Sequence, residues 1–327
     1  MIAFQTDNGT LIKGDSIEIL KNHTYRDLRG TVNLIVTSPP FPLNNKKQYG
    51  NEKGEEYLNW FKELAPVFSD LLTADGSLVI EIGNAWEPER PVQSLLHLEC
   101  LLALVKHPNA ELRLIQEFIC YNPSKLPSPA QWVTVNRLRT VDSYTHVWWL
   151  AKNDLPKADN EKVLRPYSKS MLKLLKKQKY NSGKRPSEHN ISEKGFLKDN
   201  GGSIAHNFFE MDVLDEKRDV RLPHNVLSFS NTSSNGFFLE SCRAQKIRPH
   251  PARMSGGLVN FFINFLTDEG DLVLDPFSGS NTTGFCAEKL NRRWLSFELQ
   301  QEYIDQAIVR FQDPDLHPNS VNNEQNN

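Results

Sequence analysis

A short apolar run that ends in two consecutive prolines constrains this chain more than any other feature. The run Val32–Val36 is typical of a buried strand, and Thr37-Ser38-Pro39-Pro40-Phe41 follows it directly. Proline lacks the N–H donor that a central strand needs, so the chain must leave the sheet here. The sequence therefore predicts a buried strand with a stiff loop at its carboxyl end.

A second strand-then-loop pattern occurs near the carboxyl end of the chain. Asp271–Leu274 reads as a strand, and the glycine turn Gly279–Gly284 leads into a helix over 282–290. The next strand signal, Trp294–Phe297, ends at Glu298. A strand, a glycine turn and an acid about 20 residues further on form the layout that holds an adenosine ribose.

Strand and helix signals alternate on both sides of a polar middle section. Helical spacing at 56–73 and 92–107 separates strand signals at 77–82 and 112–121, and the alternation returns after Met254. This pattern predicts an α/β fold with one doubly wound, mostly parallel sheet. The two loops should meet where the strand order reverses, which is where such sheets bind ligands.

The middle section, 152–245, differs from the rest in composition. It is rich in Ser, Asn and Gly and poor in long apolar runs, which predicts an insert with little core of its own. Within it, 157–185 carries ten Lys and Arg and two acids, although the whole chain has a net charge of −2. A solvated helix face is the plain interpretation, and a nucleic-acid surface is the functional one.

Composition disfavours several classes of protein. With 39% hydrophobic and 24% charged residues the chain is ordinary for a globular protein, and no apolar run is long enough to predict a membrane span. The first residues lack the layout of a signal peptide, so we expect a cytoplasmic protein. The four cysteines are widely separated and form no Cys/His cluster, so neither a metal site nor a disulfide framework is expected.

The glycine turn departs from the motifs that bind phosphates. Asn281 stands where a dinucleotide fingerprint has its middle glycine, and Phe285-Cys286 follows Gly284 where a P-loop needs lysine. An adenosine ligand without phosphates fits better, and S-adenosyl-L-methionine is the obvious one. On this loop alone, an ordinary strand–helix turn remains the alternative.

The proline loop suits methylation of an exocyclic amine on a base. Such a nitrogen is a poor nucleophile, because its lone pair is delocalised into the ring, and both of its N–H groups need acceptors. The Ser38 side chain and the Pro39 carbonyl can accept them, and Phe41 can stack on the base. The base must leave the duplex, at a cost of roughly a few kcal/mol. The sequence has no Pro-Cys pair, which disfavours cytosine-C5 chemistry.

The chain resembles the β-class DNA amino-methyltransferases, with the greatest similarity to their PvuII-type cytosine-N4 members. The resemblance rests on Lys13-Gly14-Asp15-Ser16, Thr37–Phe41, His250-Pro251-Ala252-Arg253 and Asp275–Gly284. It implies the methyltransferase fold in permuted order, with the catalytic motif before the cofactor motif. The implied parts are a catalytic half at 1–151, a target-recognition region at 152–245 and a cofactor-binding half at 246–312, and we expect a disordered tail at 313–327.

The resemblance also implies roles for single residues. The catalytic residues would be Ser38, Pro39, Pro40 and Phe41. The residues of the S-adenosyl-L-methionine site would be Asp15, Thr37, His250, Asp275, Phe277, Gly279, Ser280, Asn281, Thr282 and Glu298. Glu298 would hold the ribose, and His250 would shape the pocket rather than act as a base. Asp15 also reads as a helix N-cap.

Double-stranded DNA is the expected partner, and we expect basic side chains to contact it. The residues predicted to contact it are Lys46, Lys47, Arg137, Arg139, Lys176, Lys177 and Arg185. Serine before Pro-Pro favours cytosine N4, and adenine N6 is the alternative. A non-catalytic DNA-recognition module is the alternative from a different class. We further expect that the protein belongs to a restriction-modification system with a cognate endonuclease, and that it can act as a monomer. A palindrome like CAGCTG is the first target to test.

Overall fold

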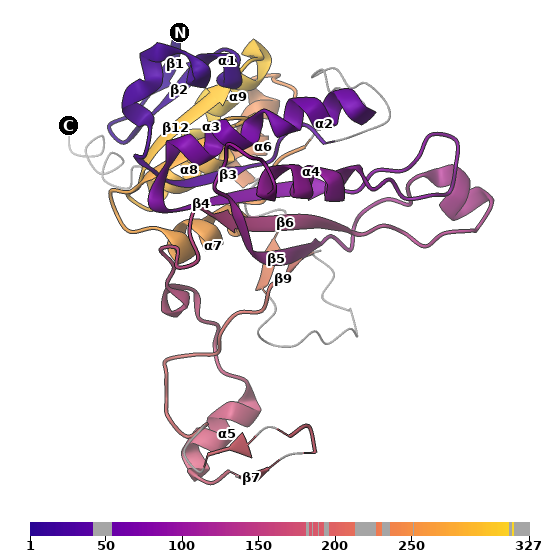
Figure 1. Cartoon of the computed structure of the whole chain (residues 1–327), viewed down its shortest axis with the longest axis vertical. Coiled ribbons are helices and arrows are strands. Elements are labelled where there is room, and N and C mark those ends of the chain that lie inside the picture. Colours follow the sequence, from indigo (N-terminus) through magenta and orange to yellow (C-terminus); the bar gives the residue numbers. More distant parts are fainter. Residues whose placement is uncertain are drawn as a thin grey trace.

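A ten-stranded sheet lies at the centre of the computed structural model, with helices on both of its faces (Figure 1). The structure describes residues 1–41, 54–180, 183–184, 186–188, 190–192, 196–212, 227–230, 236–250, 252–313 and 316. The strands of the sheet are β1 (Ile2–Gln5), β2 (Gly9–Lys13), β3 (Val32–Thr37), β4 (Leu72–Gly83), β5 (Arg113–Tyr121), β6 (Tyr144–Ala151), β9 (Phe208–Asp212), β10 (Leu227–Ser230), β11 (Leu272–Asp275) and β12 (Arg293–Glu298).

Helices and two short strands complete the described part of the chain. The helices are α1 (Ser16–Lys21), η1 (His23–Leu28), α2 (Gly54–Lys62), α3 (Leu64–Leu71), α4 (Leu96–Val105), η2 (Gln131–Val135), η3 (Asn160–Val163), α5 (Lys169–Lys177), α6 (Gly236–Ala244), α7 (Gly256–Leu266), α8 (Thr282–Lys289) and α9 (Gln301–Arg310). A separate two-stranded sheet pairs β7 (Gly183–Lys184) with β8 (Asn190–Ile191). Within these ranges no helix is long and apolar enough to cross a membrane.

The sheet is mostly parallel, as the sequence predicts. Its order is β1-β2-β12-β11-β3-β4-β6-β5-β9-β10. The pairs from β2 through β4 are parallel, and so are β5–β9 and β9–β10. The pairs β1–β2, β4–β6 and β5–β6 are antiparallel. The predicted fold class is therefore confirmed.

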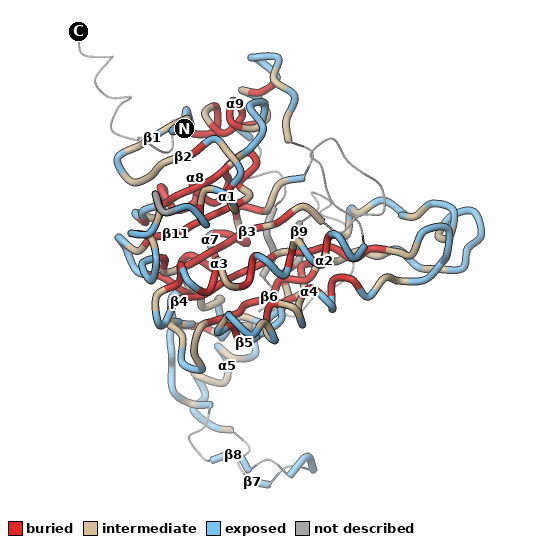
Figure 2. The backbone as a smooth tube through the Cα atoms, turned by 45° about the horizontal axis from the view of Figure 1, so that its top comes forward, coloured by how far each residue is buried: buried red, intermediate tan, exposed pale blue. Residues whose placement is uncertain are grey.

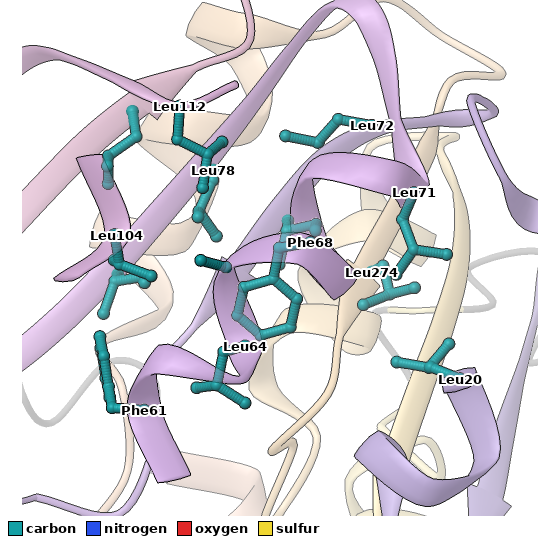
Figure 3. Close-up of a cluster of buried hydrophobic side chains, with 14 of the residues drawn as sticks. Leu20, Phe61, Leu64, Phe68, Leu71, Leu72, Leu78, Leu104, Leu112 and Leu274 are labelled. Atoms are coloured by element: carbon teal, nitrogen blue, oxygen red, sulfur yellow. The ribbon is translucent and has the colours of Figure 1, made fainter. Parts of the chain in front are cut away.

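Successive side chains of the central strands pack into two separate hydrophobic cores, one on each face of the sheet. Ile80 belongs to a buried cluster with α2, α3 and α4, whereas the neighbouring Val79 belongs to a second cluster with α7, α8 and α9. Figure 3 shows the first cluster around Phe61, Phe68 and Leu104. Because successive strand residues point to opposite faces, this division shows that helices cover both faces of the sheet. The sheet is thus doubly wound.

The strand order reverses between β3 and β11. From β3 the chain runs through α2 and α3 to β4, whereas from β11 it runs through α8 to β12 on the opposite side. The two strands are parallel neighbours, with Leu34 opposite Val273 and Ile35 opposite Leu274. Their carboxyl ends, Thr37 and Asp275, therefore lie side by side at the point where such sheets bind ligands.

The helix expected over 56–73 is divided into α2 and α3, which meet at Glu63. Pro66 lies in the first turn of α3. Backbone N–H groups in the first turn of a helix have no intrahelical partner, so the missing N–H of proline costs no hydrogen bond there. The break lets α3 follow the sheet toward β4 while α2 extends over the carboxyl ends of the strands.

Part of the predicted recognition region joins the main sheet. Strand β9 is parallel to β5, and its Phe209 is fully buried, with its ring 5.3 Å from that of Phe118 and 5.8 Å from that of Phe262. Helix α6 packs on α9 through Phe238, Cys242 and Val309. The predicted domain boundaries at 152 and 245 stay a prediction. Both β9 and α6 lie between these boundaries and pack against elements outside them.

An arm that carries α5, β7 and β8 projects from the rest of the molecule (Figures 1 and 2). At its base the two chain segments pair once, with Arg165 and Ser203 exchanging two backbone hydrogen bonds of 2.8 Å. Helix α5 contains no buried residue. The arm beyond Arg165 and Ser203 is therefore held by local contacts rather than by the core.

If β9 belongs to the core, replacing Phe209 should destabilise the whole protein. We expect Phe209→Ala to lower the free energy of unfolding by about 3–5 kcal/mol, because it leaves a cavity between packed rings. Leu172→Ala, in the exposed part of α5, should change it by less than about 0.5 kcal/mol. Denaturant unfolding of both variants measures this, and equal effects would contradict the assignment of β9.

Candidate functional site

A buried carboxylate joins the two predicted loops. Thr37 Oγ1 donates to Asp275 Oδ1 at 2.7 Å, and Thr283 Oγ1 donates to Asp275 Oδ2 at 2.7 Å. The Phe277 backbone N–H also donates to Oδ1, at 3.1 Å. Burial raises the pKa of Asp275 to about 6, against these hydrogen bonds. Thr37 and Asp275 thus bond to each other, and their predicted direct contact with a cofactor stays a prediction.

The loop after β11 is closed by Glu298 at the end of β12. The Gly279 backbone N–H donates to Glu298 Oε2 at 2.9 Å, and the Gln300 N–H donates to Oε1 at 2.7 Å. Burial raises the pKa of Glu298 above its ordinary value. Each carboxylate oxygen has a second lone pair, so both can still accept from the two hydroxyls of a ribose.

Gly279 is at a position that favours glycine. Its φ is +52°, and an added Cβ would lie 3.3 Å from His250 Nε2. A backbone without a side chain at this turn leaves room for a ligand to approach closely. This cradle, together with Glu298 at the next strand end, fits the adenosine and methionine parts of S-adenosyl-L-methionine. Among the described residues no group of side chains could hold a metal ion.

His250 lies against this turn with its ring fixed from several directions. Its ring centroid is 4.1 Å from that of Tyr303, its Nδ1 accepts from the Ala252 N–H, and its backbone N–H donates to Gln306 Oε1 at 2.6 Å. Burial lowers the pKa of His250 to about 4, so the ring is neutral at neutral pH. A neutral, weakly basic ring suits the predicted role of shaping the pocket.

Two predicted cofactor residues bond to the protein instead, and a third is buried. Asn281 is fully buried, and its Oδ1 accepts from the Gly284 N–H at 3.0 Å and from Ser296 Oγ at 2.7 Å. Ser280 accepts from Arg310 through both its carbonyl and its hydroxyl oxygen. Thr282 is the buried first residue of α8. Contact between these side chains and a cofactor stays a prediction.

The conformation of Asn281 explains its departure from the glycine motif. Its φ is +54°, in the left-handed region that asparagine tolerates better than most residues. Its side chain also caps α8, a task that glycine cannot perform. The substitution of asparagine for glycine therefore preserves the turn.

Asp15 caps helix α1 close to Glu298. Its Oδ1 accepts from the Ile17 and Glu18 N–H groups at 2.9 and 3.1 Å. The preceding Gly14 N–H donates to the carbonyl of Glu298 at 3.0 Å, because β2 and β12 are parallel neighbours. The N-cap interpretation is correct, and Asp15 lies on the side of the site that Glu298 closes.

Helix α2 contacts the proline loop that follows β3. Tyr57 OH donates to the carbonyl of Pro40 at 2.7 Å, and the rings of Trp60 and Phe277 lie 5.6 Å apart. An added Cβ on Gly83, at the end of β4, would lie 2.6 Å from the Phe41 ring. Sequence reasoning missed Tyr57 and Trp60, although the aromatic-rich stretch 57–61 soon after the proline loop was a usable signal.

The predicted DNA-contacting residues are scattered over several parts of the molecule. Lys176 and Lys177 are exposed at the end of α5, and Arg137 is exposed after η2. Arg139 is instead engaged within the protein, with Asp142 at 3.0 Å and the Pro91 carbonyl at 3.1 Å. The remaining predicted contacts, Lys46, Lys47 and Arg185, lie outside the described residues.

Known proteins match this chain over most of its length. A family model described as DNA methylase matches residues 32–309. The Type II methyltransferase M.PvuII of Proteus hauseri is 39% identical over 98% of this chain and 88% of its own length. The Type II methyltransferase M.Cfr9I of Citrobacter freundii is 24% identical over 96% of this chain and 91% of its own length.

Solved structures resemble the fold as well. The PvuII DNA methyltransferase, described as cytosine-N4-specific, aligns with a TM-score of 0.70 and 34% identity, covering 95% of this chain and 88% of that one. A DNA modification methylase from Thermus thermophilus, complexed with S-adenosyl-L-methionine, aligns with a TM-score of 0.51 and 19% identity over 94% of each chain. The second likeness supports the fold alone.

Ionisation of Asp275 should make stability depend on pH. Because its folded-state pKa is raised from 3.8 to about 6, its contribution to stability is complete below 3.8 and is lost as the pH rises through about 6. One pKa unit corresponds to about 1.4 kcal/mol. Between pH 4 and 7 the free energy of unfolding of Asp275→Asn should therefore rise by up to about 3 kcal/mol relative to that of the unmodified protein. Denaturant unfolding across this range measures the difference.

The control for this experiment is Asp305→Asn, at an exposed position on α9. Its unfolding free energy should stay parallel to that of the unmodified protein at every pH. A difference between Asp275→Asn and the unmodified protein that does not change with pH would contradict the raised pKa.

Proposed function

This chain belongs to the DNA methylase family, and on that basis we propose that it transfers a methyl group from S-adenosyl-L-methionine to the N4 amino group of cytosine in double-stranded DNA. One observation carries the proposal. The Ser-Pro-Pro-Phe loop and the glycine turn, far apart in the sequence, meet at adjacent strand ends through Thr37 and Asp275. The proline loop, which would accept from the target amine, therefore lies in the same site as the glycine turn, which would hold the cofactor.

In the proposed reaction, S-adenosyl-L-methionine supplies an electrophilic methyl group when it is bound. Glu298 would accept from the ribose hydroxyls, and Gly279 would leave the methionine part room along the backbone. Ser38 and the Pro39 carbonyl accept from the two N–H groups of the target nitrogen, so that its lone pair can turn toward the methyl group. The prolines and the hydrogen bond from Tyr57 to Pro40 hold these acceptors in place before the base arrives.

Cytosine N4 is favoured over adenine N6 as the acceptor. Serine precedes Pro-Pro at position 38, and the relative with 39% identity has a solved counterpart described as cytosine-N4-specific. The combination of Ser38, Asn281 and Glu298 also argues against a non-catalytic recognition module, which has no chemical need for this set. The base must be flipped out of the duplex to reach the loop.

The basic arm is the part that we assign to DNA binding. Lys176 and Lys177 at the exposed end of α5, with Arg137 on the loop after η2, would contact phosphates, and polar residues of the 186–245 region would read base edges. The proposal extends to a restriction-modification system with a cognate endonuclease, to action as a monomer in the cytoplasm and to a CAGCTG-like palindrome. Similarity over 98% of the chain to M.PvuII, a Type II methyltransferase, supports the restriction-modification part.

Sequencing DNA from a host that expresses the chain tests the chemistry and the site together. We expect N4-methylcytosine within one palindrome, and much slower methylation with Ser38→Ala although that variant still binds S-adenosyl-L-methionine. The loss of one acceptor should slow transfer by about 100-fold or more. Detection of N6-methyladenine alone would overturn the choice of cytosine, and normal turnover of Ser38→Ala would remove Ser38 from the mechanism.

Charge removal on α5 tests the DNA-binding surface. Replacing both Lys176 and Lys177 with Ala should weaken binding to all DNA sequences and reduce the slope of log affinity against log salt by about 2, since each phosphate contact contributes close to 1. Lys106→Ala, after α4, serves as the control and should leave the slope unchanged. A loss of affinity confined to one DNA sequence would contradict the assignment to phosphates.

A further inference from the structure

A buried polar cluster lies beside the catalytic loop and has no part in the mechanism described above. His146 on β6 contacts Glu117 through Nδ1 at 2.6 Å and Asn84 Oδ1 through Nε2 at 3.0 Å. The ring of His97, on α4, stacks on that of His146 at 4.8 Å. Asn84, His97 and His146 are each at most 8% exposed. Such a cluster costs stability unless its polar atoms find partners.

Several polar atoms of this region have no partner. Within the part of the chain that the structure describes, Asn84 Nδ2, Trp86 Nε1 and His97 Nδ1 are buried without a hydrogen bond. Asn84 is 5% exposed, and its other amide atom is held by His146. Unpaired buried donors are rare, because each forfeits its hydrogen bonds to water, and they point to a missing acceptor.

The two unpaired N–H donors follow the strand end that supports Phe41. In the parallel pair β3–β4, Thr37 lies opposite Ile80, so the proline loop and the segment after Gly83 leave the sheet at the same edge. Gly83 contacts the Phe41 ring, and Asn84 and Trp86 come directly after it. Asn84 and Trp86 thus follow the strand end that contacts the ring on which the target base is proposed to stack.

We propose that Asn84 and Trp86 form a recognition site for the acceptor edge of the flipped cytosine, an inference that rests on the proposed function. Beside its N4 amine, cytosine presents two acceptors, N3 and O2, and the two donors match them in number and in chemical type. Adenine has an acceptor next to its amine but a C–H group where cytosine has O2. One donor would therefore be stranded with adenine, which gives this site a preference for cytosine.

His146 has a positioning role in this arrangement. Its ring holds the amide oxygen of Asn84, so the NH₂ group of the same amide is left for the base. Glu117, on the neighbouring strand β5, fixes the ring in turn. The cluster keeps Asn84 in one orientation before the base arrives.

Variants that remove only the donors test the proposal. Asn84→Asp keeps an oxygen for His146 and lacks the NH₂ group, and Trp86→Phe keeps an aromatic ring and lacks the N–H. Each should lower the single-turnover rate for a duplex with the target cytosine by about 10- to 100-fold, and leave the affinity for S-adenosyl-L-methionine unchanged. The rate for the same duplex with adenine at the target position should fall less, so the cytosine preference falls. Asn260→Asp, exposed on α7, is the matched control.

The outcomes separate this inference from the proposed function. An unchanged cytosine rate in both variants, or an equal loss for cytosine and adenine, would overturn it, since a purely structural role of Asn84 affects both bases alike. If Asn84→Asp no longer binds the cofactor, Trp86→Phe decides alone. Failure of the proposed function would appear in the unmodified protein, as methylation of adenine or as no methylation.

Discussion

The site depends on one carboxylate buried between two parallel strands. Asp275 accepts from Thr37 on one side and Thr283 on the other, so the loop after β3 and the turn before α8 are fixed to a common atom group. Burying a charge costs several kcal/mol, and the three hydrogen bonds at this carboxylate offset part of that cost. The arrangement is possible only because β3 and β11 are neighbours, although 238 positions separate Thr37 from Asp275. The order of the sheet therefore determines that acceptor and cofactor loops share one site.

A second buried charge supports the cofactor loop from behind. Arg310 on α9 donates to both oxygens of Ser280, and its guanidinium carbon lies 4.0 Å from the centre of the Phe238 ring. Burial lowers the pKa of Arg310 to about 10, which leaves it charged at neutral pH. Phe238 belongs to α6, which lies at the end of the predicted recognition region. The loop proposed to receive the cofactor is therefore in contact, through one arginine, with a helix of that region.

Sequence patterns predict elements best where a strand is buried on both faces. The runs before Ser38 and before Asp275 are apolar, end at proline or glycine signals and form β3 and β11 as expected. Strand β9 was not predicted, because its burial comes from rings on β5 and α7 rather than from its own pattern. The same limit applies to the site. The glycine turn was located from its spacing, but the inward orientation of Ser280 and Asn281 depends on Arg310 and Ser296, which no local pattern connects to them.

The narrow base of the arm determines which part of the sequence can be replaced without disturbing the sheet. Arg165 and Ser203 pair through backbone atoms alone, and backbone pairing depends little on which side chains are present. Gly202 is the exception, because an added Cβ would lie 2.7 Å from the carbonyl oxygen of Arg165. Provided that this glycine is kept, the segment between the paired residues can be exchanged for another without altering the packing of the sheet. The arm is in this sense a replaceable cassette, and on its proposed assignment to DNA binding it can be exchanged while the chemistry at the strand ends is inherited unchanged.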